Sequence, residues 1–159
     1  MAKGREVELC VIKWLEDCGN TVVDATKNLY MQRQDVDVVV KSPSGEVFLC
    51  EIKADYKMSQ TKNFVFETTR IYHATAYFTL GWAIKTPAEY LLYVTPDNGD
   101  LYKFKMSILR KSCSDYLLNA GVNAKSIIVE TDKEKTTQNV LVPLTSLKYE
   151  LFNLNKIPN

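Results

Sequence analysis

Apolar and polar positions recur along this chain with two different periods. Within residues 5–18, Val11, Ile12 and Leu15 follow a helical spacing, and Gly19 provides a stop signal. Elsewhere apolar residues alternate with polar ones or form short runs between turn residues, which is typical of strands. We therefore predict strands at 21–24, 36–41, 47–53 and 63–70, two more within 86–105, and two late ones in "SIIVET" and "NVLVPL".

Two tight turns and a second helix complete this prediction. "SPSG" separates the strands at 36–41 and 47–53, and Pro96–Gly99 divides the pair within 86–105. Apolar side chains at helical spacing mark a second amphipathic helix, at Met106, Leu109, Cys113 and Leu117. The order of elements indicates an α/β or α+β fold, with a central mixed sheet flanked by helices. No repeat or linker divides the chain, so we expect a single domain over residues 1–159.

Composition supports a folded protein and places it inside the cell. The apolar fraction is 46% and the aromatic fraction 11%, as in globular domains. No apolar run approaches the ~20 residues that span a bilayer, and the charged start lacks the apolar centre of a signal peptide. The four cysteines contain no C-x-x-C pair, so we expect reduced thiols rather than disulfides or a zinc site. These features predict a soluble, cytoplasmic protein.

The chemistry available to this chain is limited by its single histidine. His73 lies between aromatic residues and is expected to be packed or on the surface. Histidine-based nucleases and Ser-His-Asp triads therefore receive no support. A net charge of +1 neither demands nor forbids a polyanionic partner. Catalysis would have to depend on carboxylates, lysines and a bound cation.

Charged residues interrupt two strands that otherwise look buried. Side chains two apart on a strand share a face, so Glu51 and Lys53 point the same way. Asp37 precedes the apolar run Val38–Val40 on the neighbouring strand of the same hairpin. Two adjacent carboxylates repel unless a positive charge lies between them, and Mg²⁺ suits oxygen ligands of this kind. Such a cation can activate water and stabilise a phosphate, with Lys53 holding the water or the phosphate.

At these positions the chain resembles the PD-(D/E)XK nuclease superfamily. The signature is an Asp at a strand start followed by E-x-K on the next strand, here Asp37 and Glu51–Lys53 with thirteen residues between. Val36 stands where the eponymous proline would be. The resemblance implies a restriction-endonuclease-like core, a bound Mg²⁺ that Mn²⁺ can replace, and catalytic roles for this acid pair and Lys53.

The resemblance extends upstream into the first predicted helix. Archaeal Holliday-junction resolvases and related nucleases share a helix layout that is similar to Gly4, Glu8, Leu15 and Gly19 here. By this resemblance Glu8 joins the metal site, directly or through water. The segments "NFVFETTR" and "GWAIKTPAEYLLYV" are also similar to small phage-type members of the superfamily.

Several assignments stay open at this level. Asp35 shares a strand face with Asp37 by alternation, and we prefer Asp37 because it directly precedes the apolar run. Glu67 is a candidate for a further acid. An exposed hairpin with a surface ion pair would also explain the E-x-K tripeptide. Candidate DNA contacts form two basic stretches: Lys57, Lys62 and Arg70 in the first, with Lys53, and Lys103, Lys105, Arg110 and Lys111 in the second.

We therefore predict a Mg²⁺-dependent DNA endonuclease, either a Holliday-junction resolvase or a site-specific nuclease of the homing or restriction type. A catalytically silent nucleic-acid-binding or assembly module on the same fold is the alternative. One site cuts one strand, so a homodimer or a dimer of dimers is expected. The aromatic segment at residues 72–82 would form the interface or pack in the core.

Overall fold

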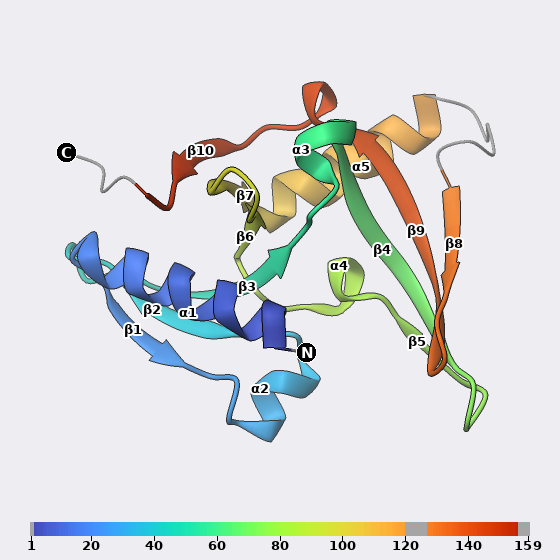
Figure 1. Ribbon diagram of the computed structural model, residues 1–159, viewed down its shortest axis with the longest axis horizontal. Helices are drawn as coiled ribbons and strands as arrows, with labels where there is room; N and C mark the ends of the chain where they lie inside the picture. Colours follow the sequence, from blue (N-terminus) through green and yellow to red (C-terminus); the bar gives the residue numbers. More distant parts are fainter. Residues whose placement is uncertain (1, 120–126, 156–159) are drawn as a thin grey trace. The chain divides into compact units, whose positions relative to one another are not determined.

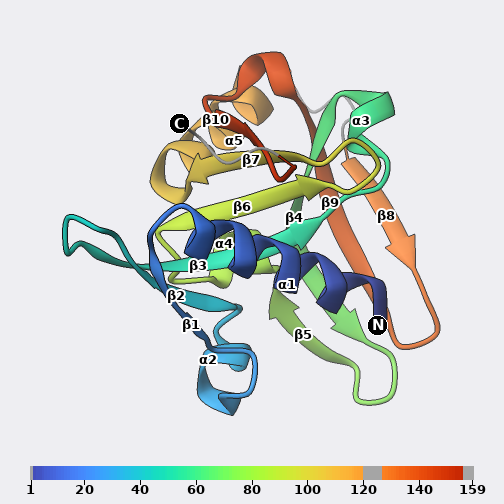
Figure 2. The same ribbon diagram turned by 60° about the vertical axis from the view of Figure 1, so that its left-hand side comes forward.

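The computed structural model describes residues 2–119 and 127–155, which form two compact units. Unit 1 consists of residues 1–61, 87–107 and 149–159, and unit 2 of residues 62–86 and 108–148. The elements of both units are labelled in Figures 1 and 2. The single domain over residues 1–159 stays a prediction. Among the described residues, no helix combines the length and the apolar content that crossing a membrane requires.

Unit 1 is built on a six-stranded mixed sheet. The strand order is β1-β2-β3-β6-β7-β10, in which β3 and β6 are parallel and all other neighbours antiparallel. Its strands are β1 (Thr21–Asp24), β2 (Val38–Lys41), β3 (Val47–Ala54), β6 (Tyr90–Thr95), β7 (Asp100–Lys105) and β10 (Glu150–Asn153). Its helices are α1 (Ala2–Asp17), α2 (Leu29–Arg33) and α3 (Met58–Thr61). The predicted α/β fold with a central mixed sheet and flanking helices is confirmed.

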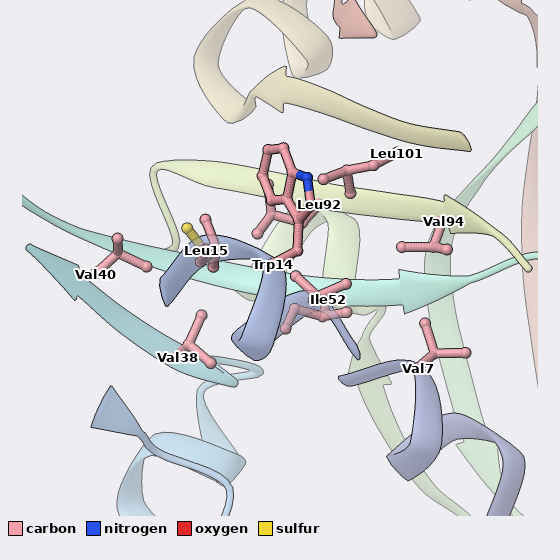
Figure 3. Close-up of a cluster of buried hydrophobic side chains, with 11 residues drawn as sticks. Val7, Trp14, Leu15, Val38, Val40, Ile52, Leu92, Val94 and Leu101 are labelled. Atoms are coloured by element: carbon pink, nitrogen blue, oxygen red, sulfur yellow. The ribbon is translucent and has the colours of Figure 1, made fainter. Parts of the chain in front are cut away.

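Helix α1 lies along one face of this sheet and makes the core of unit 1 (Figure 3). The helix supplies apolar side chains spaced three or four residues apart, and the strands supply every second residue. Trp14 also packs its indole against the ring of Phe152, with centroids 5.2 Å apart. The buried cluster comprises Val7, Val11, Trp14, Leu15, Val38, Val40, Cys50, Ile52, Leu92, Val94 and Leu101.

This packing fixes the direction of the charged residues on β2 and β3. Because Cys50 and Ile52 face α1, the intervening Glu51 points to the opposite face of the sheet. A slip of one residue would place Glu51 in the apolar cluster, so the core strongly specifies the register of β3. The observed pairing of Val38 with Cys50 is the one that such a core requires.

Unit 2 contains a four-stranded antiparallel sheet of order β5-β4-β9-β8. Its elements are β4 (Asn63–Tyr72), β5 (Tyr77–Leu80), α4 (Trp82–Lys85), β8 (Ile127–Thr131), β9 (Lys135–Pro143) and the 3-10 helix η2 (Leu144–Ser146). The strands β4 and β9 run side by side in both views (Figures 1 and 2). Helix α5 (Met106–Asn119) begins in unit 1 and continues in unit 2.

Most of the predicted elements are confirmed, with boundaries shifted by a few residues. The turns at Ser42–Gly45 and Pro96–Gly99 join the strands as expected. The prediction missed α2, α3, α4, β5 and β10, all of which are five residues long or shorter. Short elements carry too few residues to show a period. His73 is an exposed residue whose Nε2 lies 2.9 Å from the Thr136 hydroxyl.

The four cysteines are free thiols. Cys50 and Cys113 are buried, and burial raises the pKa of both thiols to about 12. Buried thiols of this kind are unreactive and behave as small apolar side chains.

Gly81 lies against β4 at the register shift between Glu67 and Thr69, where a side chain has no room. A Cβ at Gly81 would lie 2.4 Å from the carbonyl oxygen of Glu67, whereas a Cβ at Gly4 would meet nothing within 4 Å. We expect Gly81→Ala to lower the free energy of unfolding by about 2 kcal/mol, because backbone must move. Gly4→Ala should leave it unchanged or raise it slightly, since alanine favours helices. Urea unfolding of both variants checks the contrast, and equal stabilities would contradict it.

Candidate active site

The first pair of candidate residues, Asp37 and Glu51, is held together by the β2–β3 ladder. The Asp37 N–H donates to the Cys50 carbonyl at 3.0 Å, which continues the ladder by one residue beyond β2. The Ile52 N–H donates to Asp37 Oδ2 at 2.8 Å, so the carboxylate is fixed against the neighbouring strand. Asp37 and Glu51 therefore lie opposite each other on neighbouring strands, as their spacing in the sequence predicts.

Glu51 is the most deeply buried charged residue of this site, with only 1% of its surface exposed. Its Oε1 is ion-paired with Lys53 Nζ. Its Oε2 is also buried and has no hydrogen-bond donor within the described part of the chain. Burial raises the pKa of Glu51 well above its ordinary value, although the charge of Lys53 opposes this. A carboxylate oxygen buried without a donor is costly unless a cation or a proton occupies it.

Asp37 experiences the same conflict more weakly. Burial raises its pKa, while the hydrogen bond from Ile52 and the positive charge of Lys53 hold it down. The carboxyl groups of Asp37 and Glu51 lie close enough for a hydrogen bond when one of them is protonated. The Asp37–Glu51 pair therefore favours either a proton shared by the two carboxyl groups or a cation bound between them.

Lys53 supplies the positive charge nearest to this pair. Its side chain is 32% exposed, and its ammonium group is ion-paired with Glu51. Burial disfavours the charge, but Glu51, Asp37 and Asp35 outweigh it and raise the pKa of Lys53. The lysine consequently stays protonated and can donate to an anion or a water molecule.

The donors present suit a hard divalent cation. Asp37 and Glu51 offer oxygen ligands only, and Mg²⁺ binds through one or two carboxylates while keeping several waters. Within residues 2–119 and 127–155, no three or more acidic, His or Cys side chains converge closely enough to hold a metal. The structure therefore fits a cation bound by a pair of carboxylates and completed by water, rather than a protein cage.

Glu8 lies on α1, and its carboxylate is hydrogen-bonded to another residue of the same helix. Its Oε2 accepts a hydrogen bond of 2.8 Å from Arg5, one turn earlier on the helix. The negative charge of Glu8 nevertheless contributes to the raised pKa of Asp37. Glu8 is thus close enough to affect Asp37 electrostatically, and its role as a metal ligand stays a prediction. This arrangement suits contact with a cation through water.

Asp35 does not continue the strand to which Asp37 belongs. Its backbone is left-handed, with φ of 53°, and it ends helix α2 instead. The Asp35 N–H donates to Gln32 and the Val36 N–H to Met31, the pairing of a Schellman motif. Asp35 and Asp37 therefore do not share a strand face, contrary to the prediction from alternation. Asp35 still adds negative charge near Glu51 and Lys53.

The remaining candidate residues are occupied in other ways. Glu67 and Arg70, both in unit 2, form an ion pair with each other, and Glu67 also accepts a 3.2 Å hydrogen bond from the Trp82 N–H. Lys57 and Lys62 are exposed, in units 1 and 2 respectively. A further acid at Glu67 and DNA contacts by Lys57, Lys62 and Arg70 stay predictions.

The second predicted basic stretch is largely taken up by structural contacts. Lys103 pairs with Glu150, and Lys111 with Asp115. The guanidinium of Arg110 donates to the carbonyls of Ala83 and Thr86. These contacts leave fewer positive charges in this stretch that could bind a polyanion.

The chain matches no protein-family model and no curated protein. Among solved structures it is similar to a bacterial homing endonuclease, I-Ssp6803I, with a TM-score of 0.50 and 16% sequence identity. The similarity covers 67% of this chain and 69% of that one. The fold is restriction-endonuclease-like. At this identity the comparison establishes the fold and leaves the roles of individual residues to be tested.

Sequence reasoning missed Arg5, which contacts Glu8, and Asp24 and Thr26, which contact Arg5. Arg5 donates from Nη1 to Glu8 and Thr26, and from Nη2 to Asp24. The i,i+3 spacing of Arg5 and Glu8 could have been found from the sequence. The contact with Asp24 could not, because it depends on how α1 crosses β1.

The buried carboxyl of Glu51 should make the metal-free protein less stable as pH rises. The folded protein holds a proton on Glu51 at pH values where the unfolded chain is ionised, so it binds more protons than the unfolded chain. Stability is therefore highest at or below the ordinary glutamate pKa and falls as pH rises toward the raised pKa. Asp37 contributes with the same sign.

We therefore expect Glu51→Gln to stabilise the metal-free protein at pH 8, by about 1–3 kcal/mol, with a smaller gain at pH 5. Thermal unfolding in a chelator at both pH values measures the difference, which corresponds to about 2–4 °C per kcal/mol. Glu46→Gln, at an exposed turn, is the control and should change little. A Glu51→Gln variant that is less stable than wild type at pH 8 would contradict the assignment of a strained buried carboxylate.

Proposed function

We propose that this protein is a Mg²⁺-dependent DNA endonuclease that hydrolyses phosphodiester bonds. The carrying observation is the buried Oε2 of Glu51, which lacks a donor in the described chain and lies beside Asp37 and the protonated Lys53. Nucleases with this fold typically use divalent metals, and the similar solved structure is a homing endonuclease. Asp37 and Glu51 would hold the cation, with Glu8 acting directly or through water.

Each residue contributes a distinct part of the reaction. A bound Mg²⁺ supplies charge stabilisation at the phosphate and lowers the pKa of water. Asp37 is oriented by the Ile52 N–H, so its carboxylate stays aimed at one position without reorganising. Lys53 donates to the attacking water or to a phosphate oxygen, while its ion pair with Glu51 keeps it charged. The site thus stabilises negative charge that develops during hydrolysis.

A silent binding module would gain nothing from this arrangement. A buried carboxylate without a donor lowers stability, and replacing Glu51 by an apolar residue would remove that cost. Retention of a destabilising acid in a sheet is characteristic of a working site. The geometry therefore favours catalysis over binding alone.

The proposed chemistry is tested by DNA cleavage in defined metal ions. Linear, supercoiled and four-way-junction DNA should be cut in Mg²⁺ or Mn²⁺ and stay intact in a chelator, with slow turnover in Ca²⁺ because its ligand geometry is looser. Lys53→Ala and Asp37→Asn should each lower turnover at least about 100-fold. Asp35→Asn, the matched control, should retain most activity, and Glu8→Gln should lose it in part.

The substrates in this assay also separate the two kinds of endonuclease. Preferential cutting of the junction supports a resolvase, and cutting of one linear sequence supports a site-specific nuclease. Full activity in excess chelator would refute the proposal. Reversed effects of Asp35→Asn and Asp37→Asn would assign the metal to Asp35 instead.

We further propose that two copies of the chain cooperate, because a single site cuts one strand of a duplex. The apolar side chains available for such an interface lie on the β4–β5 hairpin: Ile71 (43% exposed), Tyr77 (63%), Phe78 (57%) and Leu80 (47%). Residues 71–84 contain no Lys, Arg, Asp or Glu. A two-fold contact buries the same surface patch of both copies against each other, so an uncharged segment avoids repulsion between like charges. Trp82 is instead buried.

Light scattering should show a dimer, or a dimer of dimers, at micromolar concentration. Phe78→Glu places a charge on the hairpin and should shift the protein to a monomer with unchanged circular dichroism. Leu118→Glu is the control, since Leu118 is 78% exposed on α5 and outside the hairpin. A wild-type monomer that only nicks duplex DNA would refute the assembly proposal and leave the nuclease proposal intact.

A further inference from the structure

We propose that Arg5 is a positioning residue for the cation site, which fixes the carboxylate of Glu8 relative to Asp37. This inference rests on the proposed function, because it assigns a role to Glu8 in cation binding. It concerns a residue that neither the motif nor the fold comparison designates.

Arg5 has three partners, from two parts of unit 1. Its Nη1 donates to Glu8 Oε2 at 2.8 Å and to the Thr26 hydroxyl at 2.9 Å. Its Nη2 forms an ion pair with Asp24 Oδ2. The guanidinium therefore joins the first turns of α1 to the end of β1 and the segment after it. The planar guanidinium of an arginine can donate to partners in all of these directions at once, whereas the ammonium of a lysine cannot.

The partners of Arg5 are themselves fixed. The Thr26 N–H and hydroxyl both donate to Asp24 Oδ1, at 3.0 and 2.6 Å. The guanidinium of Arg5, together with Thr26, lowers the pKa of Asp24 to about 2, so this carboxylate stays ionised. Arg5 is thus anchored on one side by a charged, internally hydrogen-bonded turn.

The same turn is bonded to the candidate cation ligand. The Ala25 N–H donates to the Asp37 carbonyl at 2.8 Å. A continuous path therefore runs from Glu8 through Arg5 to residues 24–26 and on to the backbone of Asp37. Glu8 and Asp37 lie on different elements, and this path fixes one with respect to the other.

The charge of Arg5 alone would have the opposite effect on a cation. A guanidinium near the site repels Mg²⁺, so removing it would tighten cation binding if electrostatics were its only contribution. If Arg5 instead orients Glu8, removing it frees a flexible side chain and weakens binding. Partners that orient metal ligands typically contribute 10–100-fold in affinity. The direction of the change therefore distinguishes the two roles.

The test is a double-mutant cycle read by Mn²⁺ binding to the complete chain, with free Mn²⁺ followed by electron paramagnetic resonance. Arg5→Met, which keeps the apolar stem, should weaken Mn²⁺ binding about 10-fold. In a Glu8→Gln background the same substitution should have no further effect. Arg5→Lys keeps the charge without the fork and should weaken binding less than Arg5→Met.

The matched control is Lys13→Met, which removes one positive charge from the same helix. Lys13 pairs only with Asp17 in the described contacts, and its side chain is 74% exposed, so binding should not change. Unchanged or tighter binding in Arg5→Met overturns the inference, as does equal weakening in the Glu8→Gln background. If Arg5→Met fails to fold, the same double-mutant cycle is measured with Arg5→Lys, and the same outcomes overturn the inference. If the wild-type protein binds no Mn²⁺, or binds it equally well after Asp37→Asn, the proposed function is overturned as well.

Discussion

The rest of this structure depends on how a carboxylate is kept inside a β-sheet. The register of β2 and β3 is fixed by the apolar residues that face α1, and that same register forces Glu51 and Asp37 onto the opposite face. The core therefore contributes the stability that offsets the burial of two acids. The pairing of β2 with β3 therefore determines both the apolar packing on one face of the sheet and the positions of the two acids on the other.

The site is also asymmetric in how firmly its members are held. Asp37 is fixed by a backbone N–H and Glu51 by its burial, whereas Glu8 is fixed by one arginine. Backbone donors do not change rotamer, so the acid pair is pre-organised independently of side-chain motion. Glu8 depends instead on the side chain of Arg5, which is itself partly exposed. In the proposed cation site, this difference would suit an ion that keeps part of its hydration shell.

The sequence was sufficient to predict the longer sheet strands and the placing of Asp37 opposite Glu51, because both follow from a period of two. It was insufficient where a side chain's role depends on a neighbouring element. Asp35 looked equivalent to Asp37 by alternation, yet Asp35 lies just after α2 in a left-handed conformation that breaks the strand. The cap of that short helix, Asn28, was a local signal that could have revealed it. The Arg5–Asp24 contact had no local signal, since it joins residues nineteen positions apart.

The discontinuity of unit 1 has a consequence for synthesis on the ribosome. The parallel pairing of β3 with β6 requires a long crossover, and residues 62–86 of unit 2 lie within it. The outer strand β10 is at residues 150–153, so its pairing with β7 must wait until these residues have emerged. All of unit 2, by contrast, is translated before β10 exists. A nascent chain therefore exposes the open edge of β7 longest, and this is the edge through which two unfinished chains would most readily associate.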